Sequence, residues 1–488
     1  MGTVIPNNKA AFELEEFVRC VRGEVLQPGR GASVVGVGTD SRRVQPGNAF
    51  VALSGERFDG HDHASSATEA GASVLLVSRE VDARGPAIVR VDDTLEALGR
   101  LGREHRRRWA SKVRTRGWDG KVVGITGSAG KTTTCRATTA VLEAVRPGGV
   151  QTPAGNLNNA IGVPLVLLGL EERHGQAVVE IGTNSPGEIA YGAGLAEPDV
   201  AVMTLVACAH TQGLGSIEAV AEEKGALFAS LRPEGVCVAN ADDAHVLSQV
   251  KRSNGARVLT FGTSPNADVR VVQSTRRGWE GQDLRIEARV GSATKIVLAS
   301  VPLLGAAGIY ASAAALAVAW AVCGDDVDLE AAAKGLRGLR AESGRLRPRT
   351  LGRGSIVIDD AYNANPASMR DSIDVAAKLA GDLGRRLVLV LGEMRELGTQ
   401  SEREHRRVGE QVAGLKPGVL IAVGGDARLF AEATTDGLSE FVPDAETAAG
   451  RVLDAVGEQD VILVKGSRGI ALERVVAALD AWGEKQSR

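Results

Sequence analysis

At 488 residues, the chain is too long for one hydrophobic core, and its length predicts about three domains. A hydrophobic content of 44%, a charged content of 24% and a net charge of −3 are ordinary for a globular protein and give no global preference for nucleic acid or an anionic membrane. Five scattered cysteines without a C-x-x-C pair argue against a zinc knuckle or a disulfide framework and indicate a reducing, cytoplasmic setting.

The first residues carry no charged head followed by an apolar core, so we expect no signal peptide. The most apolar stretch, 311–322, is too short and too rich in alanine to span a bilayer, and we expect it to be a buried helix. We therefore expect a monomer with no membrane span and no nucleic-acid partner.

Residues 1–115 alternate between helix-like and strand-like segments and are predicted to form a first domain. The helix is expected at 12–20, and the strands at 49–53, 73–77 and 87–91. Two polar clusters, 39–42 and 56–63, lie between these segments. They are either solvated turns or part of a ligand site, because binding groups collect on such loops.

The segment 104–116 is strongly basic and contains one tryptophan. It is either a nucleic-acid patch or a solvated helix that links two domains. We favour the linker, because the basic charge is local and is offset elsewhere in the chain.

An apolar strand at 122–126 runs directly into a glycine loop and then into a helix-like segment, a pattern that holds phosphates. Lys131 is expected at the outer phosphates and the Thr132 hydroxyl on a magnesium ion. A strict P-loop has glycine where this chain has Ile125, so the sequence carries the shorter Gly-x-x-Gly-Lys-Thr form. The residues expected around the phosphates are Gly127, Ser128, Ala129, Gly130, Lys131, Thr132 and Thr133.

Residues 116–335 are predicted to form a central α/β domain built on a parallel sheet. Further apolar runs at 177–181, 200–206 and 236–240 indicate strands that helices cover on both faces. Ligands of such sheets bind at the carboxyl ends of the strands. Glu180 and Asn240 stand at two of these ends, and His210 follows another.

Residues 336–488 are predicted to form a third, Rossmann-like domain. A basic, glycine-rich stretch at 335–354 precedes it, and its strands are expected at 356–358, 387–391, 420–423 and 461–464.

Several polar groups have both a chemical and a structural interpretation when taken alone. Glu180 is a magnesium ligand or a structural carboxylate, His210 is more often structural, and Lys224 has the pattern of an exposed helix charge. The asparagine-rich stretch 152–164 suits a sugar or phosphate but also a series of turns. Paired carboxylates and amides at 359–366, and a cationic pair at 465–468, each follow a strand.

Taken together, motifs along the whole chain resemble those of the ATP-dependent Mur ligases, whose phosphate loop has the same short form. The matching motifs are Thr39–Arg42 with Asp59–His61, Thr126–Thr133, Gly155–Asn159 with Ile161–Pro164, Glu180–Gly182, Ala209–His210, Asn240–Asp243, Asp359–Pro366, Leu391–Met394 and Lys465–Arg468. The asparagine-rich motifs resemble the branch of the family that adds D-alanyl-D-alanine.

The resemblance implies a three-domain, ADP-forming enzyme that uses ATP and Mg²⁺. Its substrates would be UDP-N-acetylmuramoyl-tripeptide, held by the first domain, and D-alanyl-D-alanine, held by the third. The tripeptide carboxylate would become an acyl phosphate, which the dipeptide amine then attacks.

The resemblance also assigns roles to single residues. Lys131, His210 and Lys224 would be catalytic, with Lys224 carrying a carbamate, and Thr132, Glu180, His210 and Lys224 would bind or direct metal. The nucleotide would contact Asn240, Arg345 and Asp360 in addition to the loop. The substrates would contact Ser41, Arg42, Asn158, Asn159, Asn363, Asn365, Lys465 and Arg468.

One stretch departs from the family pattern. Where the family has Gly-x-His-Asn-x-x-Asn, this chain has Gly305-Ala-Ala-Gly-Ile-Tyr-Ala311, so the histidine and both asparagines are absent. The alternatives are another amino-acid-adding member of the superfamily, such as the diaminopimelate- or lysine-adding ligase or folylpolyglutamate synthase, and a nucleotide-binding homologue without turnover.

Overall fold

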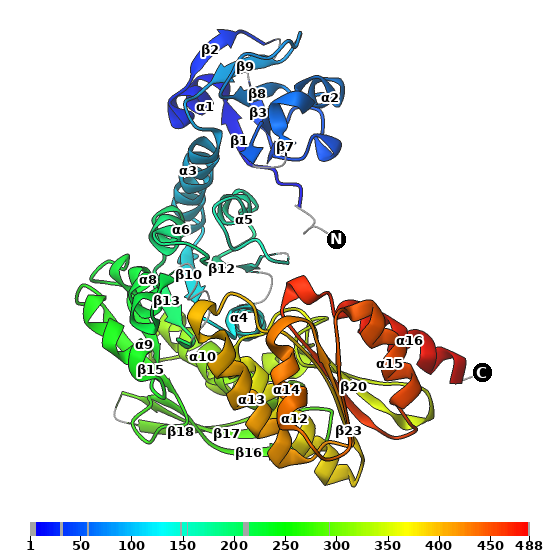
Figure 1. Cartoon of the computed structure of the whole chain (residues 1–488). Coiled ribbons are helices and arrows are strands. Elements are labelled where there is room, and N and C mark those ends of the chain that lie inside the picture. Colours follow the sequence, from blue (N-terminus) through cyan, green and yellow to red (C-terminus); the bar gives the residue numbers. More distant parts are fainter. Residues whose placement is uncertain are drawn as a thin grey trace.

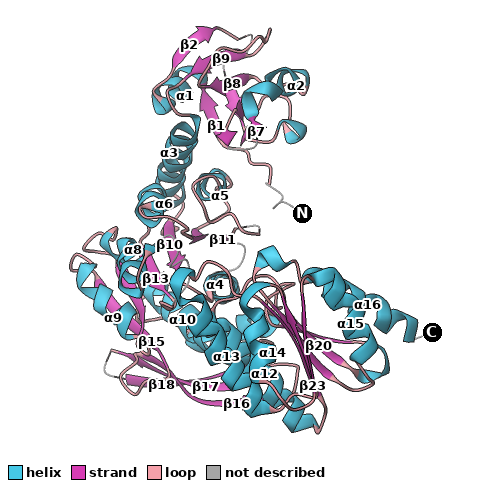
Figure 2. Cartoon of the chain, viewed as in Figure 1, coloured by secondary structure: helices cyan, strands magenta, loops and turns pink. Residues whose placement is uncertain are grey.

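The computed structural model describes residues 6–29, 33–55, 58–146, 149–153, 155–207, 214–291 and 293–486. Within them, sheets of five, nine and six strands follow one another along the chain (Figures 1 and 2). This three-sheet α/β architecture confirms the predicted fold class. The domain limits at 115/116 and 335/336 stay a prediction. His210 lies outside the described residues.

The first sheet has the strand order β2-β9-β8-β5-β4, and the chain pairs β1 with β3 beside it. The predicted strands at 49–53, 73–77 and 87–91 correspond to β5, β8 and β9. The helix predicted at 12–20 begins later than expected, because its first residues form β1. The elements are β1 (Ala11–Glu13), α1 (Leu14–Val21), β2 (Glu24–Gln27), β3 (Ser33–Val35), β4 (Val37–Gly38), β5 (Ala49–Val51), β6 (Ser54–Gly55), β7 (Phe58–Asp59), α2 (Ala64–Glu69), β8 (Val74–Val77) and β9 (Ala87–Arg90).

The basic stretch lies on α3 (Thr94–Arg114), a long helix that runs from the first sheet to the central one (Figure 1). Asp93 caps its first turn by accepting hydrogen bonds from two backbone N–H groups. The helix packs on α1 at one end and on α5 and α6 further along. The stretch is therefore helical and contacts both parts of the chain, while its role as a linker between domains stays a prediction.

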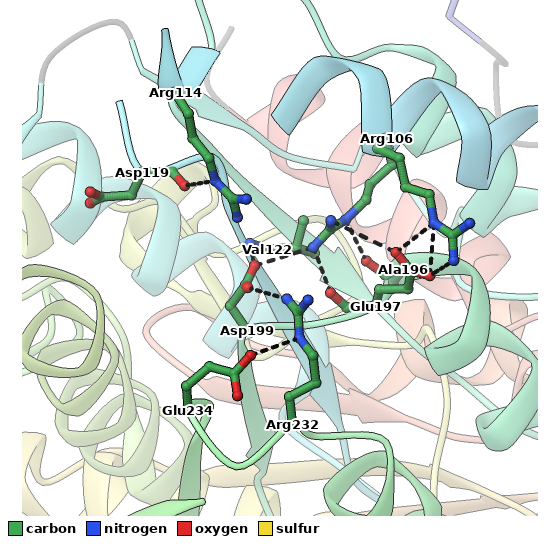
Figure 3. A network of polar contacts seen from close by, with 10 residues as sticks. Arg106, Arg114, Asp119, Val122, Ala196, Glu197, Asp199, Arg232 and Glu234 are labelled. Atoms are coloured by element: carbon green, nitrogen blue, oxygen red, sulfur yellow. Dashed lines mark hydrogen bonds and ion pairs between the residues drawn. The ribbon is translucent and has the colours of Figure 1, made fainter. Parts of the chain in front are cut away.

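Two arginines of α3, Arg106 and Arg107, pair with acidic groups of the central domain, and Figure 3 shows the network around Arg106. Arg106, whose side chain is 5% exposed, donates to the Ala196 and Glu197 carbonyls and to Asp199 Oδ2 at 3.3 Å. The same Asp199 oxygen accepts the Val122 N–H at 2.8 Å, and Arg232 donates to its other oxygen. The Asp199 carboxylate thus joins α3 to Val122, near the start of one central strand, and Asp199 itself directly precedes another.

The central sheet has the order β11-β12-β10-β13-β14-β15-β16-β17-β18, with parallel pairing from β11 to β16. Helices α4, α10 and α11 cover one face, and α5, α6 and α8 the other. The strands are β10 (Lys121–Thr126), β11 (Val150–Gln151), β12 (Gln176–Glu180), β13 (Val200–Met203), β14 (Val236–Asn240), β15 (Arg257–Gly262), β16 (Val269–Arg276), β17 (Gln282–Val290) and β18 (Ala293–Val301). The helices are α4 (Lys131–Val145), α5 (Gly162–Leu168), α6 (Glu188–Ala196), α8 (Ile217–Ala229), α9 (Ala244–Gln249), α10 (Gly305–Cys323) and α11 (Leu329–Gly335).

The strands predicted in this domain are all present, although β13 ends at Met203 rather than at 206. The prediction missed the far side of the sheet, where β17 pairs antiparallel with both β16 and β18. Residues of β17 alternate between buried and exposed, because only one face of this extension packs on the core.

The third sheet has the order β19-β20-β24-β21-β22-β23 and is parallel except for β19. Helices α12 to α14 cover one face, and α15 and α16 the other, as a Rossmann-like domain requires. The elements are β19 (Arg347–Thr350), β20 (Ile356–Asp360), α12 (Pro366–Leu383), β21 (Leu387–Gly392), α13 (Ser401–Leu415), β22 (Val419–Val423), α14 (Arg428–Ala433), β23 (Leu438–Val442), α15 (Ala445–Ala455), β24 (Val461–Lys465) and α16 (Glu473–Gln486).

Helix α10 is the one described helix that is long and apolar enough to cross a membrane, and 72% of its most apolar window is buried inside the protein. It packs against α4 and β15. The prediction of a buried helix at 311–322 is confirmed.

Replacing Arg106 by methionine should lower the free energy of unfolding by about 3 kcal/mol, because it removes the buried cation that pairs with Asp199 and donates to two carbonyls. Urea unfolding followed by tryptophan fluorescence measures this change. As a control, Arg116→Met removes an ion pair with Glu172 whose two side chains are both largely exposed. This variant should change stability by less than about 1 kcal/mol. Equal effects of the two substitutions would contradict the structural role of Arg106.

Candidate functional site

A cavity of about 810 Å³ lies where the central sheet meets the third domain. The ends of β10, β12 and β13 line it from one side, and the ends of β20 and β24 line it from the other. Because these are all carboxyl ends of parallel strands, the cavity occupies the place where such sheets bind ligands.

The glycine loop forms the floor of the cavity. Strand β10 ends at Thr126, and α4 begins at Lys131, so the loop places a helix N-terminus toward the cavity. Gly127 has a φ of +152°, and a Cβ there would overlap the Thr204 hydroxyl. The Thr204 hydroxyl donates to the Ala129 carbonyl at 2.6 Å, which holds the loop in shape.

Lys131 folds back over this loop, where its Nζ donates to the Gly127 carbonyl at 2.8 Å. Burial lowers the pKa of Lys131, and the charge of Glu180 opposes part of that effect. An incoming phosphate would therefore meet a cation held by a single backbone hydrogen bond.

Glu180 is the polar centre of the site. It is 3% exposed, and its two oxygens accept hydrogen bonds from Thr132 Oγ1 at 2.7 Å and Asn158 Nδ2 at 2.8 Å. Oxygen donors of this kind suit Mg²⁺, which takes one or two protein oxygens beside phosphate and water. The described residues contain no group of three histidine, cysteine or acidic side chains that could hold a metal without a ligand.

The third domain supplies a buried ion pair. Lys465 Nζ donates to Asp360 Oδ2 at 2.6 Å and to the Asn363 carbonyl at 3.0 Å. Asp360 also accepts from the Ser372 hydroxyl and from the Leu346 N–H. These contacts hold the Lys465 side chain between β24 and β20 at the edge of the cavity.

Tyr362 is a functional candidate that the sequence prediction did not name. Its ring lies between the guanidinium groups of Arg345, at 4.2 Å, and Arg468, at 5.0 Å. The Asn156 side chain donates to its hydroxyl across the two domains. The tyrosine stands within the predicted 359–366 motif, so its position was a usable signal.

The predicted amides reach the cavity in different ways. Asn158 and Asn159 line it from the central domain, and Asn159 Oδ1 also caps α5. Asn363 and Asn365 line it from the third domain. Asn365 caps α12 together with Ser368, and its Nδ2 lies 3.4 Å from the Ser128 carbonyl of the loop.

Other predicted residues lie away from the cavity lining. Asn240 is buried, and its amide donates to the Thr204 carbonyl and accepts the Asp242 N–H. Ser41 and Arg42 belong to the first domain, where Arg42 is 86% exposed and pairs with Asp40. Lys224 is not the exposed helix charge that its local pattern suggests, because it is only 1% exposed.

Burial, followed by the positive charge of Lys131, lowers the pKa of Lys224 to about 7. The amine is therefore substantially neutral at neutral pH. A neutral amine is the form that can react with carbon dioxide.

Alanine at position 127 should weaken nucleotide binding by at least about tenfold, because the added Cβ displaces the loop that holds the phosphates. Titration with a fluorescent ATP analogue measures the dissociation constant. Gly194→Ala is the control, since a Cβ at Gly194 meets nothing within 4 Å. Unchanged affinity in the Gly127 variant would contradict the placement of the phosphates.

The low pKa of Lys224 predicts a pH-dependent cost of folding. Above about pH 10.5 the lysine is neutral in both folded and unfolded protein, and below about pH 7 the folded protein bears the full cost of a buried charge. The free energy of unfolding of Lys224→Met should therefore rise relative to that of the original protein as the pH falls from about 10.5 to about 7. The difference should reach several kcal/mol at pH 6. Urea unfolding at pH 6 and pH 10 tests it, with exposed Lys378→Met as control. A variant less stable at pH 6 would contradict it.

Three family models match the chain in order. They are the catalytic domain of the Mur ligase family at residues 33–106, the Mur ligase middle domain at 125–319, and the glutamate ligase domain of the Mur ligases at 344–468. The glycine loop and Glu180 fall within the second match, and Asp360 and Lys465 within the third.

Similar proteins cover nearly the whole chain. The UDP-N-acetylmuramoyl-tripeptide–D-alanyl-D-alanine ligase of Escherichia coli K12 is 36% identical over 96% of this chain and 98% of its own length. The structure of MurF from Acinetobacter baumannii matches with a TM-score of 0.84 at 28% identity, covering 98% of this chain and 99% of that one. MurF ligase from Thermotoga maritima, solved in complex with ADP, matches with a TM-score of 0.77 at 28% identity, covering 92% and 98%. The chain belongs to the Mur ligase family.

Proposed function

We propose that this enzyme is an ATP-dependent ligase that joins D-alanyl-D-alanine to UDP-N-acetylmuramoyl-tripeptide during peptidoglycan precursor synthesis. The relative from E. coli, which aligns over nearly its whole length, bears the name of this activity. The observation that carries the proposal is the single cavity in which a phosphate loop faces the polar ends of β20 and β24. Such a cavity brings a nucleotide and an amine substrate together.

The proposed reaction needs two successive transfers. The tripeptide carboxylate attacks the γ-phosphorus of ATP, which gives an acyl phosphate and releases ADP. The dipeptide amine then attacks the acyl carbon, loses a proton and expels inorganic phosphate. The protein contributes positioning and charge neutralisation more than covalent chemistry.

Lys131 is the cation that we assign to the outer phosphates. Arg345 lines the same cavity from the connection to the third domain, where Tyr362 and Glu342 orient its guanidinium group. We assign Arg345 to the transferred phosphate and Asp360 to the ribose. Asn240 then supports the nucleotide site through the Thr204 carbonyl rather than by direct contact.

Magnesium would be held by Thr132 and Glu180, whose oxygens already lie together. Its chemistry would be to neutralise phosphate charge. His210 is proposed to hold a second ion. A carbamate on Lys224 is proposed as an anion directed toward these ions, and the low pKa of the lysine supports it.

The substrate contacts remain proposals from the resemblance. Asn158 and Asn159 would meet the muramoyl side, and Ser41 and Arg42 of the first domain the uridine nucleotide. Asn363, Asn365 and Arg468 would meet the dipeptide, with Lys465 positioning them through Asp360. We also propose a monomer that works in the cytoplasm, which agrees with the four free thiols among the described residues.

A mixing assay tests the function. UDP-N-acetylmuramoyl-tripeptide and ATP are incubated with D-alanyl-D-alanine, lysine, meso-diaminopimelate or glutamate in turn, and phosphate release is measured. We expect release with the dipeptide alone, and a loss of at least about 100-fold in Lys131→Ala, because the phosphate charge loses its buried partner. Lys378→Ala, on the exposed face of α12, should keep full activity.

The other outcomes point to the alternatives. Release with a single amino acid but not with the dipeptide would identify another ligase of the superfamily. ATP binding without release under any amine would identify a nucleotide-binding homologue without turnover. Near-full activity in Lys131→Ala would refute the role of that lysine.

A further inference from the structure

The first turns of α10 form one wall of the cavity, and this wall is almost without polar side chains. Ala306, Ala307 and Ala311 line it, where the family pattern has a histidine and two asparagines in the same stretch. Tyr310 is the one residue of this wall whose side chain carries a hydrogen-bonding group.

The hydroxyl of Tyr310 is already occupied. It donates to Asp242 Oδ2 at 2.9 Å, and Asp242 accepts further hydrogen bonds from the Thr263 N–H, the Thr263 hydroxyl and the Ser264 N–H. Burial, followed by the Asp242 contact, raises the pKa of Tyr310 to about 12, so the hydroxyl stays protonated and donating. The ring is thereby held through its hydroxyl, which Asp242 already engages.

Asn240 does not replace the missing groups. Its amide donates to the Thr204 carbonyl and accepts the Asp242 N–H, and Asn240 does not belong to the cavity lining. On α10 and at Asn240, the side chains that could read the hydrogen-bonding edge of a base are thus absent or engaged.

The two tyrosines of the cavity differ in what covers their rings. Tyr362 lies between two guanidinium groups. Among the described residues, the Tyr310 ring has no aromatic or cationic partner over it. The chain has only three tyrosines and 3% aromatic residues, so a fixed, uncovered ring beside the phosphate loop is a specific feature.

We propose that the nucleotide base stacks on Tyr310 and that this enzyme therefore discriminates weakly between adenine and guanine triphosphates. Stacking strengthens binding by about 10- to 100-fold and tolerates any base, because every base has a π-face. Strong discrimination requires buried hydrogen-bonding groups that the wrong base leaves unpaired, and this wall has none free. Asp242 is the positioning residue for the ring. The inference rests on the proposed use of a nucleoside triphosphate by this site.

The first experiment compares ATP with GTP in the amide-forming reaction. We expect kcat/KM for ATP to exceed that for GTP by no more than about tenfold, since only stacking differs between the bases. A preference above about 1,000-fold would overturn the inference, because it would require a base-reading group.

The second experiment measures binding without turnover, by calorimetry with ATP, GTP and inorganic tripolyphosphate. Tyr310→Ala should weaken ATP and GTP alike by about 10- to 100-fold, while tripolyphosphate, which has no base, binds unchanged. Tyr310→Phe keeps the ring and should stay within about threefold of the original affinity. Asp242→Asn should weaken both nucleotides less than Tyr310→Ala does, because the ring remains but is less firmly held.

The binding results separate this inference from the proposed ligase activity. An enzyme that makes no amide but binds ATP and GTP alike would refute the activity and keep the stacking assignment. Loss of tripolyphosphate binding in Tyr310→Ala, or loss of nucleotide binding in Tyr310→Phe, would overturn the assignment.

Discussion

A buried carboxylate on which three elements converge organises the site. Glu180 ends β12, accepts from the first turn of α4 through Thr132, and accepts from the asparagine-rich loop through Asn158. A buried charge without such donors would be strongly destabilising, so folding requires that the loop, the helix and the strand meet there. The Glu180 oxygens also suit a divalent cation. The contacts of Glu180 with Thr132 and Asn158 thus hold the site together and place oxygen ligands where metal and phosphate would bind.

Polar contacts between the central and third domains also shape the cavity. Asn365 reaches the loop carbonyl of Ser128, and Asn156 reaches the Tyr362 hydroxyl. The guanidinium groups of Arg345 and Arg468 both lie over the Tyr362 ring, so one ring arranges two cations that line the cavity. The third domain therefore adds cationic groups to the cavity that the phosphate loop lines.

The sequence predicted the parallel strands and the loop well, because continuous apolar runs and a glycine-rich turn are local signals. It missed β16 to β18, where one exposed face weakens the apolar pattern. Lys224 shows where prediction from local sequence fails. The charged residues next to it along α8 indicate an exposed side chain, but the packing of the fold buries it. The prediction correctly placed Asn240 at the end of a strand. Its amide, however, bonds to the Thr204 carbonyl and the Asp242 N–H instead of lining the cavity, and the sequence alone does not show that these groups meet.

Helix α3 is braced at its central end by Arg106 and Asp199, so the first sheet is held on a stiff support rather than on a flexible tether. Its 21 residues rise about 31 Å at 1.5 Å per residue. Movement of the first sheet relative to the central one must therefore bend this helix or break the buried contact between Arg106 and Asp199.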